Sequence, residues 1–462
     1  MSDPNWTVLL PPLLAIGLAL LTRQVYLSLF SGIWLGCFLL DGGVFGSLAG
    51  AIDAAIEVLA NPGDARVIVF TLVIGAFILT LERSGGVTGF IRLLERGRWV
   101  TDGKRAQWMA WTIGILIFIE SNITVLVAGT VSRPLFDRFR VAREKLAYLI
   151  DSTSAPICML IPLNAWGAFN LGLLDGLGVE QPLRVLLGAI PMNLYAITAV
   201  ALAAYTVARN FNLGPMAEAE HRAAAGEVEA VQQEAQILKH SAPPNAFNML
   251  LPVFCLVGAM PVFLLVTGDG DLFAGSGSTS VLWASLLALT VVSVLVLAQR
   301  SMNLDQLTRS WLTGAGNMLP IATVLLLALA LGGVAKALGT GVYVAGLVGE
   351  TLPAWLLPAS LFLVSGGIAF SVGSSWGTFS IMLPIAIPVA AALGVDPTLF
   401  VAAILSGGIF GDHSSPISDT TIVSSLAAGT DHIDHVSTQL PYALLAGSLS
   451  LAGFLILGLI LS

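Results

Sequence analysis

Apolar runs long enough to cross a lipid bilayer follow one another along almost the whole chain, and few folds are compatible with that pattern. A membrane-spanning helix needs about 20 apolar residues, so the chain has room for roughly ten to twelve crossings once one polar stretch is set aside. Only 10% of its residues are Asp, Glu, Lys or Arg, against about 25% in soluble domains. We therefore expect an all-α polytopic membrane protein and exclude a soluble, nucleic-acid-binding or disordered one.

The sequence predicts no cofactor and no ATP-driven step. Cys37, Cys158 and Cys255 lie far apart inside apolar runs, which predicts neither disulfides nor a metal–thiolate site. No G-x-x-x-x-G-K-[S/T] loop occurs, and the one polar stretch is too short for a nucleotide domain. Residues 1–6 carry no basic stretch, so we expect no cleaved signal peptide.

Positive charge is confined to the first part of the chain, because all 20 Lys and Arg precede residue 337. Basic clusters flank the apolar segment 107–130 on both sides, and basic loops mark the cytoplasmic face of a membrane. With both ends on one face, a segment of about 107–135 must be a re-entrant hairpin. Its middle, 120–124, is polar, which is tolerated at membrane depth only beside protein or a water-filled cavity. The amphipathic stretch 86–100 predicts an interfacial helix on the same face.

The polar stretch 209–245, rich in Glu, Ala and Gln, predicts a partly helical cytoplasmic linker between two membrane halves. A shift of 254 positions aligns Ser121 with Ser375 and Thr124 with Thr378, which suggests an internal repeat. Each half has a hairpin with a Ser-x-x-Thr tip, followed by a helix interrupted near a Ser-x-Pro-Ile motif. We expect membrane halves 1–208 and 246–462, hairpins at about 107–135 and 354–394, and broken helices at about 143–174 and 397–428.

The two repeats are expected to have inverted topology. The second hairpin has no basic residue at either flank, whereas the first is basic at both. Inverted repeats whose broken helices meet near the midplane are an architecture of secondary transporters.

Ionisable residues at membrane depth are the strongest functional candidates. Segment 406–425, SGGIFGDHSSPISDTTIVSS, holds Asp412, His413 and Asp419 between apolar runs. Ser415 before Pro416 fits an N-cap and a first helical position, so we expect an unwound link at 411–415 and a helix that restarts after it. The alternative is that both carboxylates merely cap a helix start and favour its dipole.

The matching break in the first half begins at Asp151. Oxygen ligands without a fixed positive charge suit a metal cation, and a carboxylate that exchanges the cation for a proton is the minimal antiport device. We predict Na⁺ at Asp412 and Asp151, with Asn122, Ser154, Ser375, Thr378 and Ser415 completing its shell. The full set of candidate ion- or substrate-binding residues is Glu120, Ser121, Asn122, Thr124, Asp151, Ser152, Thr153, Ser154, Asn164, Ser374, Ser375, Thr378, Asp412, His413, Ser414, Ser415 and Asp419.

The cluster 431–435, DHIDH, has the composition of a ligand group. A solvated polar loop that caps the final helix is favoured over a metal site. A pH-sensing role of His432 and His435 stays open, because histidine titrates near neutral pH.

Two segments resemble one family of transporters. GDHSSPISDTTIVSSLAAGTDHIDHVSTQLPYAL, from residue 411, and VAREKLAYLIDSTSAPICMLIPLNAWGAF, from residue 141, are similar to NhaC-type Na⁺/H⁺ antiporters of the ion transporter superfamily. The resemblance implies a multi-pass protein of the prokaryotic inner membrane. It also implies a homodimer and an elevator-like movement of a transport domain against a scaffold.

The leading hypothesis is therefore a Na⁺/H⁺ antiporter. The alternative is a Na⁺- or H⁺-coupled carrier of an amino acid or small carboxylate, for which Asn164, Trp166 and Trp376 would supply a larger pocket. An enzyme such as an intramembrane aspartyl protease is disfavoured, because residues 408–412 do not match the Gly-x-Gly-Asp of such proteases.

Overall fold

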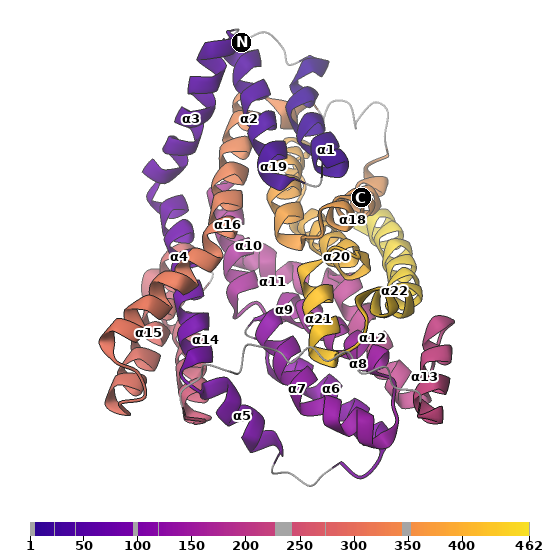
Figure 1. Ribbon diagram of the computed structural model, residues 1–462. Coiled ribbons are helices and arrows are strands. Elements are labelled where there is room, and N and C mark those ends of the chain that lie inside the picture. Colours follow the sequence, from indigo (N-terminus) through magenta and orange to yellow (C-terminus); the bar gives the residue numbers. More distant parts are fainter. Residues whose placement is uncertain are drawn as a thin grey trace.

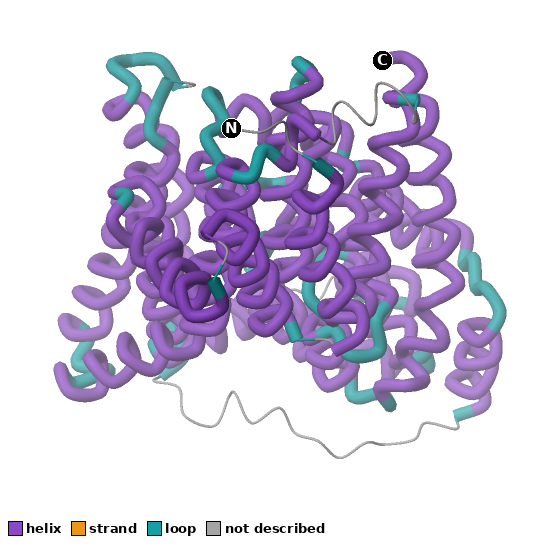
Figure 2. Tube along the Cα trace, turned by 90° about the horizontal axis from the view of Figure 1, so that it is seen from above, coloured by secondary structure: helices purple, strands orange, loops and turns teal. Residues whose placement is uncertain are grey.

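The computed structural model is a bundle of helices (Figure 1). It describes residues 5–22, 24–41, 43–95, 100–118, 120–226, 243–272, 274–343 and 353–461. Every regular element within these ranges is helical, as the tube view also shows (Figure 2). The expected all-α fold class is confirmed.

Seven helical segments in the described residues are long and apolar enough to cross a membrane, or nine if each of two bent pairs counts as one span. This is fewer than the ten to twelve crossings expected. The difference arises because part of the apolar sequence forms shorter helices, among them Trp6–Ala19 and Val25–Leu40. The seven segments are α4 (Pro62–Arg83), α14 (Phe247–Thr267), α15 (Gly277–Ala298), α16 (Leu304–Ala337), 354–372 with α18 (Leu357–Val372), α19 (Ser375–Leu393) and α22 (His432–Leu461).

One group of helices packs around α16, the longest helix of the described chain. α4 and α2 contact α16, and α14 and α15 pack on each other beside α4, on the left of Figure 1. This group also includes the N-terminal helices α1 (Leu10–Thr22), α2 (Val25–Asp41) and α3 (Val44–Ala60). The amphipathic helix α5 (Gly86–Glu95) lies at the lower end, where a surface helix is expected; residues 96–99 lie outside the described part.

A second group contains two helix pairs and two broken helices. α7 (Ser121–Phe139) packs against α21 (Asp419–Ala428), so elements from the two halves interdigitate. Within the second half, α18 packs against α20 (Thr398–Ser414). The paired helices α7 and α19 begin at Ser121 and Ser375 and end at Phe139 and Leu393, which is the same offset of 254 at both ends. The remaining elements are α6 (Gly103–Leu116), α7 (Ser121–Phe139), α8 (Arg143–Ser152), α9 (Ala155–Leu160), α10 (Ala165–Gly176), α20 (Thr398–Ser414) and α21 (Asp419–Ala428).

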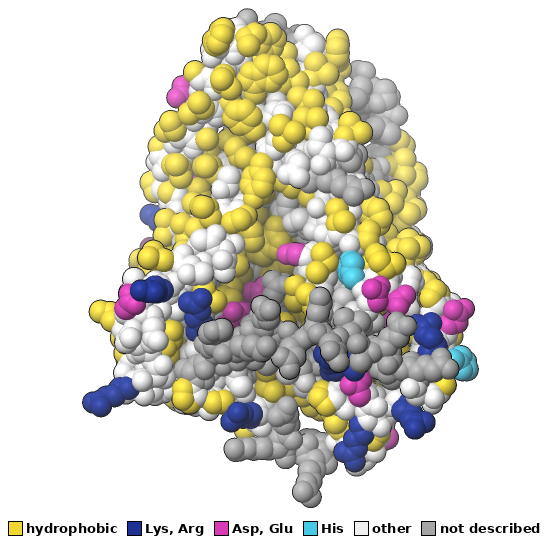
Figure 3. Space-filling model, in the orientation of Figure 1, with side chains coloured by type: hydrophobic (Ala, Val, Ile, Leu, Met, Phe, Trp, Pro, Cys, Tyr) yellow, Lys and Arg dark blue, Asp and Glu magenta, His cyan; other side chains and the backbone are white. Residues whose placement is uncertain are grey.

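Polar contacts hold the start of the expected linker against the membrane helices. α11 (Pro182–Ala189) and α12 (Leu194–Arg209) precede α13 (Pro215–Ala225), which falls within the stretch expected to be partly helical. Glu220 of α13 lies 3.8 Å from the Lys145 ammonium group, and Arg222 lies 3.0 Å from Glu144. Residues 227–242 lie outside the described part. Lys and Arg side chains gather in the lower part of the face in Figure 3, whereas its upper part is apolar.

Candidate functional site

The second broken helix has its break between α20 and α21. α20 continues through Asp412 to Ser414, and α21 begins at Asp419 with Ser418 as its N-cap. The expected unwound link at 411–415 is therefore wrong, as is the assignment of Ser415 as an N-cap. Pro416 ends a helix here, because it holds the preceding Ser415 in an extended conformation (φ −84°, ψ 131°).

Asp412 is a buried carboxylate that has one oxygen without a protein hydrogen bond. Its Oδ2 atom accepts a hydrogen bond from the hydroxyl of Ser375, the first residue of α19. Its Oδ1 atom is buried and has no hydrogen-bond partner among the described residues. Only 2% of Asp412 is exposed. Buried polar atoms are nearly always paired, so an unpaired carboxylate oxygen indicates a place for a cation or a proton.

Asp151 lies near the end of α8 and joins the two broken helices. Its Oδ2 atom accepts hydrogen bonds from Gln439 Nε2 (2.7 Å) and Thr421 Oγ1 (3.1 Å). Gln439 also donates to the backbone carbonyl of His413, at 2.7 Å. Asp151 is 1% exposed, and among the described residues no Lys or Arg forms an ion pair with it. The acid is therefore stabilised by neutral donors rather than by a fixed positive charge.

Two buried histidines face Asp151. His413 Nε2 lies 3.9 Å and His435 Nε2 lies 4.0 Å from its Oδ2 atom. His413 Nδ1 is 2.7 Å from the Tyr195 hydroxyl of α12, and its Nε2 is 3.3 Å from Ser152 Oγ. The structure thus places His413 and Ser152, both expected at the site, in direct contact.

The expected solvated loop at 431–435 is wrong for His435. α22 begins at His432, and His435 is fully buried, with its ring nitrogens 2.9 Å from Gln439 Oε1 and 2.8 Å from Ser425 Oγ. The helical period places His435 and Gln439 on one face of α22, and this face contacts α8 and α21. Within the described residues, no group of three or more His, Cys, Asp or Glu is placed to hold a metal ion.

The turns between α6 and α7 and between α18 and α19, which were predicted to be hairpin tips, have related caps. Glu120 is the N-cap of α7 and accepts from Ile123 N at 2.9 Å, whereas Ser374 caps α19 and accepts from Gly377 N at 3.3 Å. The threonine hydroxyl of each Ser-x-x-Thr motif donates to the cap carbonyl, Thr124 at 2.9 Å and Thr378 at 3.0 Å. Asn122 lies in the first turn of α7, but its side chain is outside the described part.

The other expected site hydroxyls also donate their protons to backbone carbonyls. Ser154 donates to Asp151 O at 3.0 Å, and Ser415 donates to Phe370 O at 2.7 Å. Such hydroxyls keep their oxygen lone pairs for a cation. The remaining expected residues have these partners: Thr153 donates to Leu149 O, Ser414 donates to Phe410 O, Ser121 donates to Glu120 Oε1, and Asn164 caps α10 while donating to Cys158 O.

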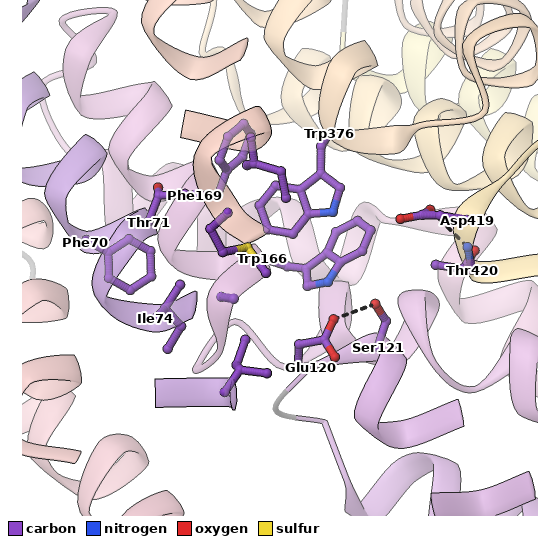
Figure 4. Close-up of a pocket in the computed structure, with 14 residues that line it drawn as sticks. Phe70, Thr71, Ile74, Glu120, Ser121, Trp166, Phe169, Trp376, Asp419 and Thr420 are labelled. Atoms are coloured by element: carbon purple, nitrogen blue, oxygen red, sulfur yellow. Dashed lines mark hydrogen bonds between the residues drawn. The ribbon is translucent and has the colours of Figure 1, made fainter. Parts of the chain in front are cut away.

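The hydrogen-bonded residues around Asp151, namely Thr421, Gln439, His413, His435, Ser152 and Tyr195, form a buried network. A cleft lies beside this network, between the predicted hairpin tips and the first helix group (Figure 4). It contains about 520 Å³ of empty space, part of it open to solvent. Glu120, Asp419 and Trp376 line it, and the rings of Trp166 and Trp376 pack with centroids 4.6 Å apart. The structure therefore separates the predicted residues: Asp151 and His413 are buried in the network, Asp412 is buried beside Ser375, and Glu120 and Asp419 face the cleft.

Three residues of the network were missed from the sequence: Gln439, Thr421 and Tyr195. Gln439 follows His435 by one helical turn, so reading 432–439 as a helix would have found it. Nothing in the sequence indicates that Tyr195 of α12 contacts His413 of α20.

An all-helical membrane protein with broken helices that meet at buried carboxylates belongs to the class of secondary transporters. The chain belongs to the Na⁺/H⁺ antiporter family, whose sequence profile matches residues 157–459. The resemblance to NhaC-type antiporters is thereby confirmed, and both the family and the structural neighbours are transporters.

Relatives of known name match only part of the chain. A Haemophilus influenzae protein described as uncharacterized is 31% identical over 99% of this chain and 91% of its own length. The arginine/ornithine antiporter ArcD of Halobacterium salinarum is 37% identical over 23% of this chain and 22% of ArcD. The Na⁺/H⁺ antiporter NhaC of Alkalihalophilus pseudofirmus is 33% identical over 18% of each chain. This chain thus covers about a fifth of the length of the two named antiporters.

Two solved structures share the fold. The YdaH transporter of Alcanivorax borkumensis has a TM-score of 0.59 at 14% identity and covers 97% of each chain. MtrF of Neisseria gonorrhoeae, from a class of antimetabolite efflux pumps, has a TM-score of 0.57 at 14% identity, covering 92% of this chain and 86% of MtrF.

Proposed function

We propose that the protein exchanges Na⁺ for H⁺ across a prokaryotic inner membrane. The observation that carries the proposal is the buried Oδ1 atom of Asp412, which lacks a hydrogen-bond partner among the described residues. A lone ionised oxygen in that place is costly, and either a proton or a cation removes the cost. Alternate occupation by Na⁺ and H⁺ is the coupling that an exchanger requires.

Asp151 supports the same conclusion from the first half of the chain. Gln439 and Thr421 provide neutral donors to it, and neither of them cancels its charge. No Lys or Arg among the described residues forms an ion pair with Asp151, Asp412 or Asp419. An acidic region without fixed cations attracts a mobile one. The predicted shell of oxygens around Asp412 and Asp151 is part of this proposal.

The elevator-like movement, the inverted topology and the homodimer also belong to the proposal. The cleft lies where the hairpin tips and broken helices meet α4 and α16, so a movement of one helix group against the other would change access to it. α19 packs on α16 and α10 packs on α4, and we propose that these are the surfaces that slide.

Proteoliposomes with a trapped pH-sensitive dye test the exchange. We expect addition of Na⁺ to drive proton movement in the opposite direction, and K⁺ at equal concentration to drive little, because the buried oxygen site favours one ion size. The proton movement that Li⁺ drives measures how strictly the site selects among cations. Proton movement that is the same for every cation, or absent for all, would contradict the proposal.

A carrier of an organic solute is the second candidate, because named relatives include an arginine/ornithine antiporter and a malate-2H⁺/Na⁺-lactate antiporter. Uptake of radiolabelled amino acids and carboxylates under an imposed Na⁺ gradient separates it from simple ion exchange.

Cysteine labelling tests the inverted topology. Arg105, at the start of α6, and Val395, after α19, are exposed positions at the bases of the two hairpins. In a background with Cys255→Ser, we expect an impermeant thiol reagent to reach Arg105→Cys from the cytoplasm and Val395→Cys from outside, because only the first hairpin has basic flanks. Labelling of both positions from one side would exclude inversion.

A further inference from the structure

The cleft has a mostly apolar lining, which does not suit Na⁺ alone. Its empty space of about 520 Å³ includes the part that is open to solvent. Figure 3 shows this face of the molecule hollowed at mid-height between apolar surfaces. Concave sites with apolar walls and a few polar groups are the usual form of small-molecule sites.

The charge of the cleft has one sign. Glu120 at the first hairpin tip and Asp419 at the start of α21 line it, and none of its described lining residues is Lys, Arg or His. Figure 4 shows both carboxylates directed toward the space beside the two indole rings. Asp419 is exposed and accepts a hydrogen bond from Thr420 N at 2.9 Å. Two acids in a partly enclosed cleft concentrate cations there.

Aromatic rings form the wall opposite the acids. Trp376 of α19 lies with its ring centroid 4.6 Å from that of Trp166 and 4.7 Å from that of Phe169, both on α10. Trp166 and Phe169 are buried, whereas Trp376 is only partly covered. Indole rings attract cations through their faces, and organic ammonium ions are the ligands that such walls recognise. The apolar lining is completed by Phe70, Ile74, Ile78, Ala165, Met318 and Ile321.

We propose that this cleft binds a small organic ammonium ion that has one positive group and a compact apolar or aromatic body. The ammonium group contacts Glu120 and Asp419, and the body lies against Trp376 and the side chains of α4 and α16. A ligand that also carries a carboxylate is disfavoured, because the two acids repel it and no described lining residue is basic. This inference goes beyond Na⁺/H⁺ exchange and does not depend on the Asp412 site.

Equilibrium dialysis of the detergent-purified full chain against radiolabelled 2-phenylethylammonium tests the assignment. Three compounds of similar shape compete with it: 2-phenylethanol is neutral, 3-phenylpropionate is anionic, and phenylalanine is zwitterionic. We expect saturable binding of the ammonium ion and at least about tenfold weaker competition by the other three, since one lost charge contact of about 1.4 kcal/mol is a factor of ten. Equal or tighter binding of the anion overturns the inference, as does the absence of saturable binding.

Two variants assign the contacts. Asp419→Asn should weaken ammonium binding at least about tenfold and leave 2-phenylethanol unchanged, whereas Trp376→Leu should weaken both compounds. Asp396→Asn, in an exposed loop before α20, is the matched control and should change neither. Ammonium binding that survives both cleft variants excludes the site. If a variant does not fold, the competition series on the unmodified protein decides alone.

The result of the ammonium-binding experiment can be distinguished from the result of the Na⁺/H⁺ exchange experiment. Na⁺-driven proton movement without ammonium binding overturns this inference only. Ammonium binding by a protein that shows no Na⁺-driven proton movement overturns the ion exchange only.

Discussion

Replacing Asp412 by Asn is expected to lower Na⁺-driven proton movement in proteoliposomes by at least about 100-fold. Asn keeps the size of the side chain and can still accept the Ser375 hydrogen bond, but it removes the charge. Removing one partner of a buried ionic contact costs about 3–5 kcal/mol, and each 1.4 kcal/mol is a factor of about ten in affinity. Rates at subsaturating Na⁺ with a trapped pH-sensitive dye measure the effect.

Folding and charge number must be controlled for. Asp396→Asn removes one acid from the loop before α20 and should transport like the unmodified protein, because Asp396 is exposed. Both variants should elute as one peak in size-exclusion chromatography. If Asp412→Asn is folded and transports at a near wild-type rate, the carboxylate serves only the helix end, and the proposed exchange site is wrong.

The fold and the main acids follow from simple physical rules. Apolar length predicts helices, and a charge at membrane depth is costly unless it has a function, so Asp151 and Asp412 are conspicuous in the sequence. The offset of 254 positions between Ser121 and Ser375 corresponds to the first residues of α7 and α19. The repeat thus located the starts of α7 and α19, and the cost of a buried charge located the carboxylates; that the two helix pairs are re-entrant hairpins stays a prediction.

The register of the break could not be predicted. Ser followed by Pro is compatible with a helix start and with a helix end. In the structure Ser415 follows the end of α20, and its hydroxyl makes a tertiary contact, the hydrogen bond to Phe370 O. A local pattern cannot show that contact.

The network around Asp151 was also beyond sequence reasoning. Gln439 is separated from Asp151 by 288 positions, and Tyr195 reaches His413 across 218. The segment 431–435 was interpreted by its composition, whereas the helical phase of α22 decides that His435 is buried. Residues that act through such long-range contacts can be identified only from the packed arrangement of the helices.

The half-saturating Na⁺ concentration is expected to rise about tenfold for each pH unit below the pKa of the site carboxyl, with little change in maximal rate. Protons and Na⁺ compete for one oxygen site in the proposed exchange, and competitive linkage requires this slope. Initial rates of proton movement at a series of Na⁺ concentrations between pH 6 and pH 9 give both parameters.

A separate pH sensor at the histidines of α22 would act differently. It would change the maximal rate and leave the Na⁺ affinity nearly flat. Gln can replace His435 as a partner of Gln439 and Ser425 without titrating, so the double variant His432→Gln, His435→Gln should keep the affinity slope if competition is correct. His221→Gln on α13, an exposed histidine, is the control. A flat affinity profile in the unmodified protein would contradict shared-site exchange, because a carboxylate that must lose a proton before it binds Na⁺ cannot have a pH-independent affinity.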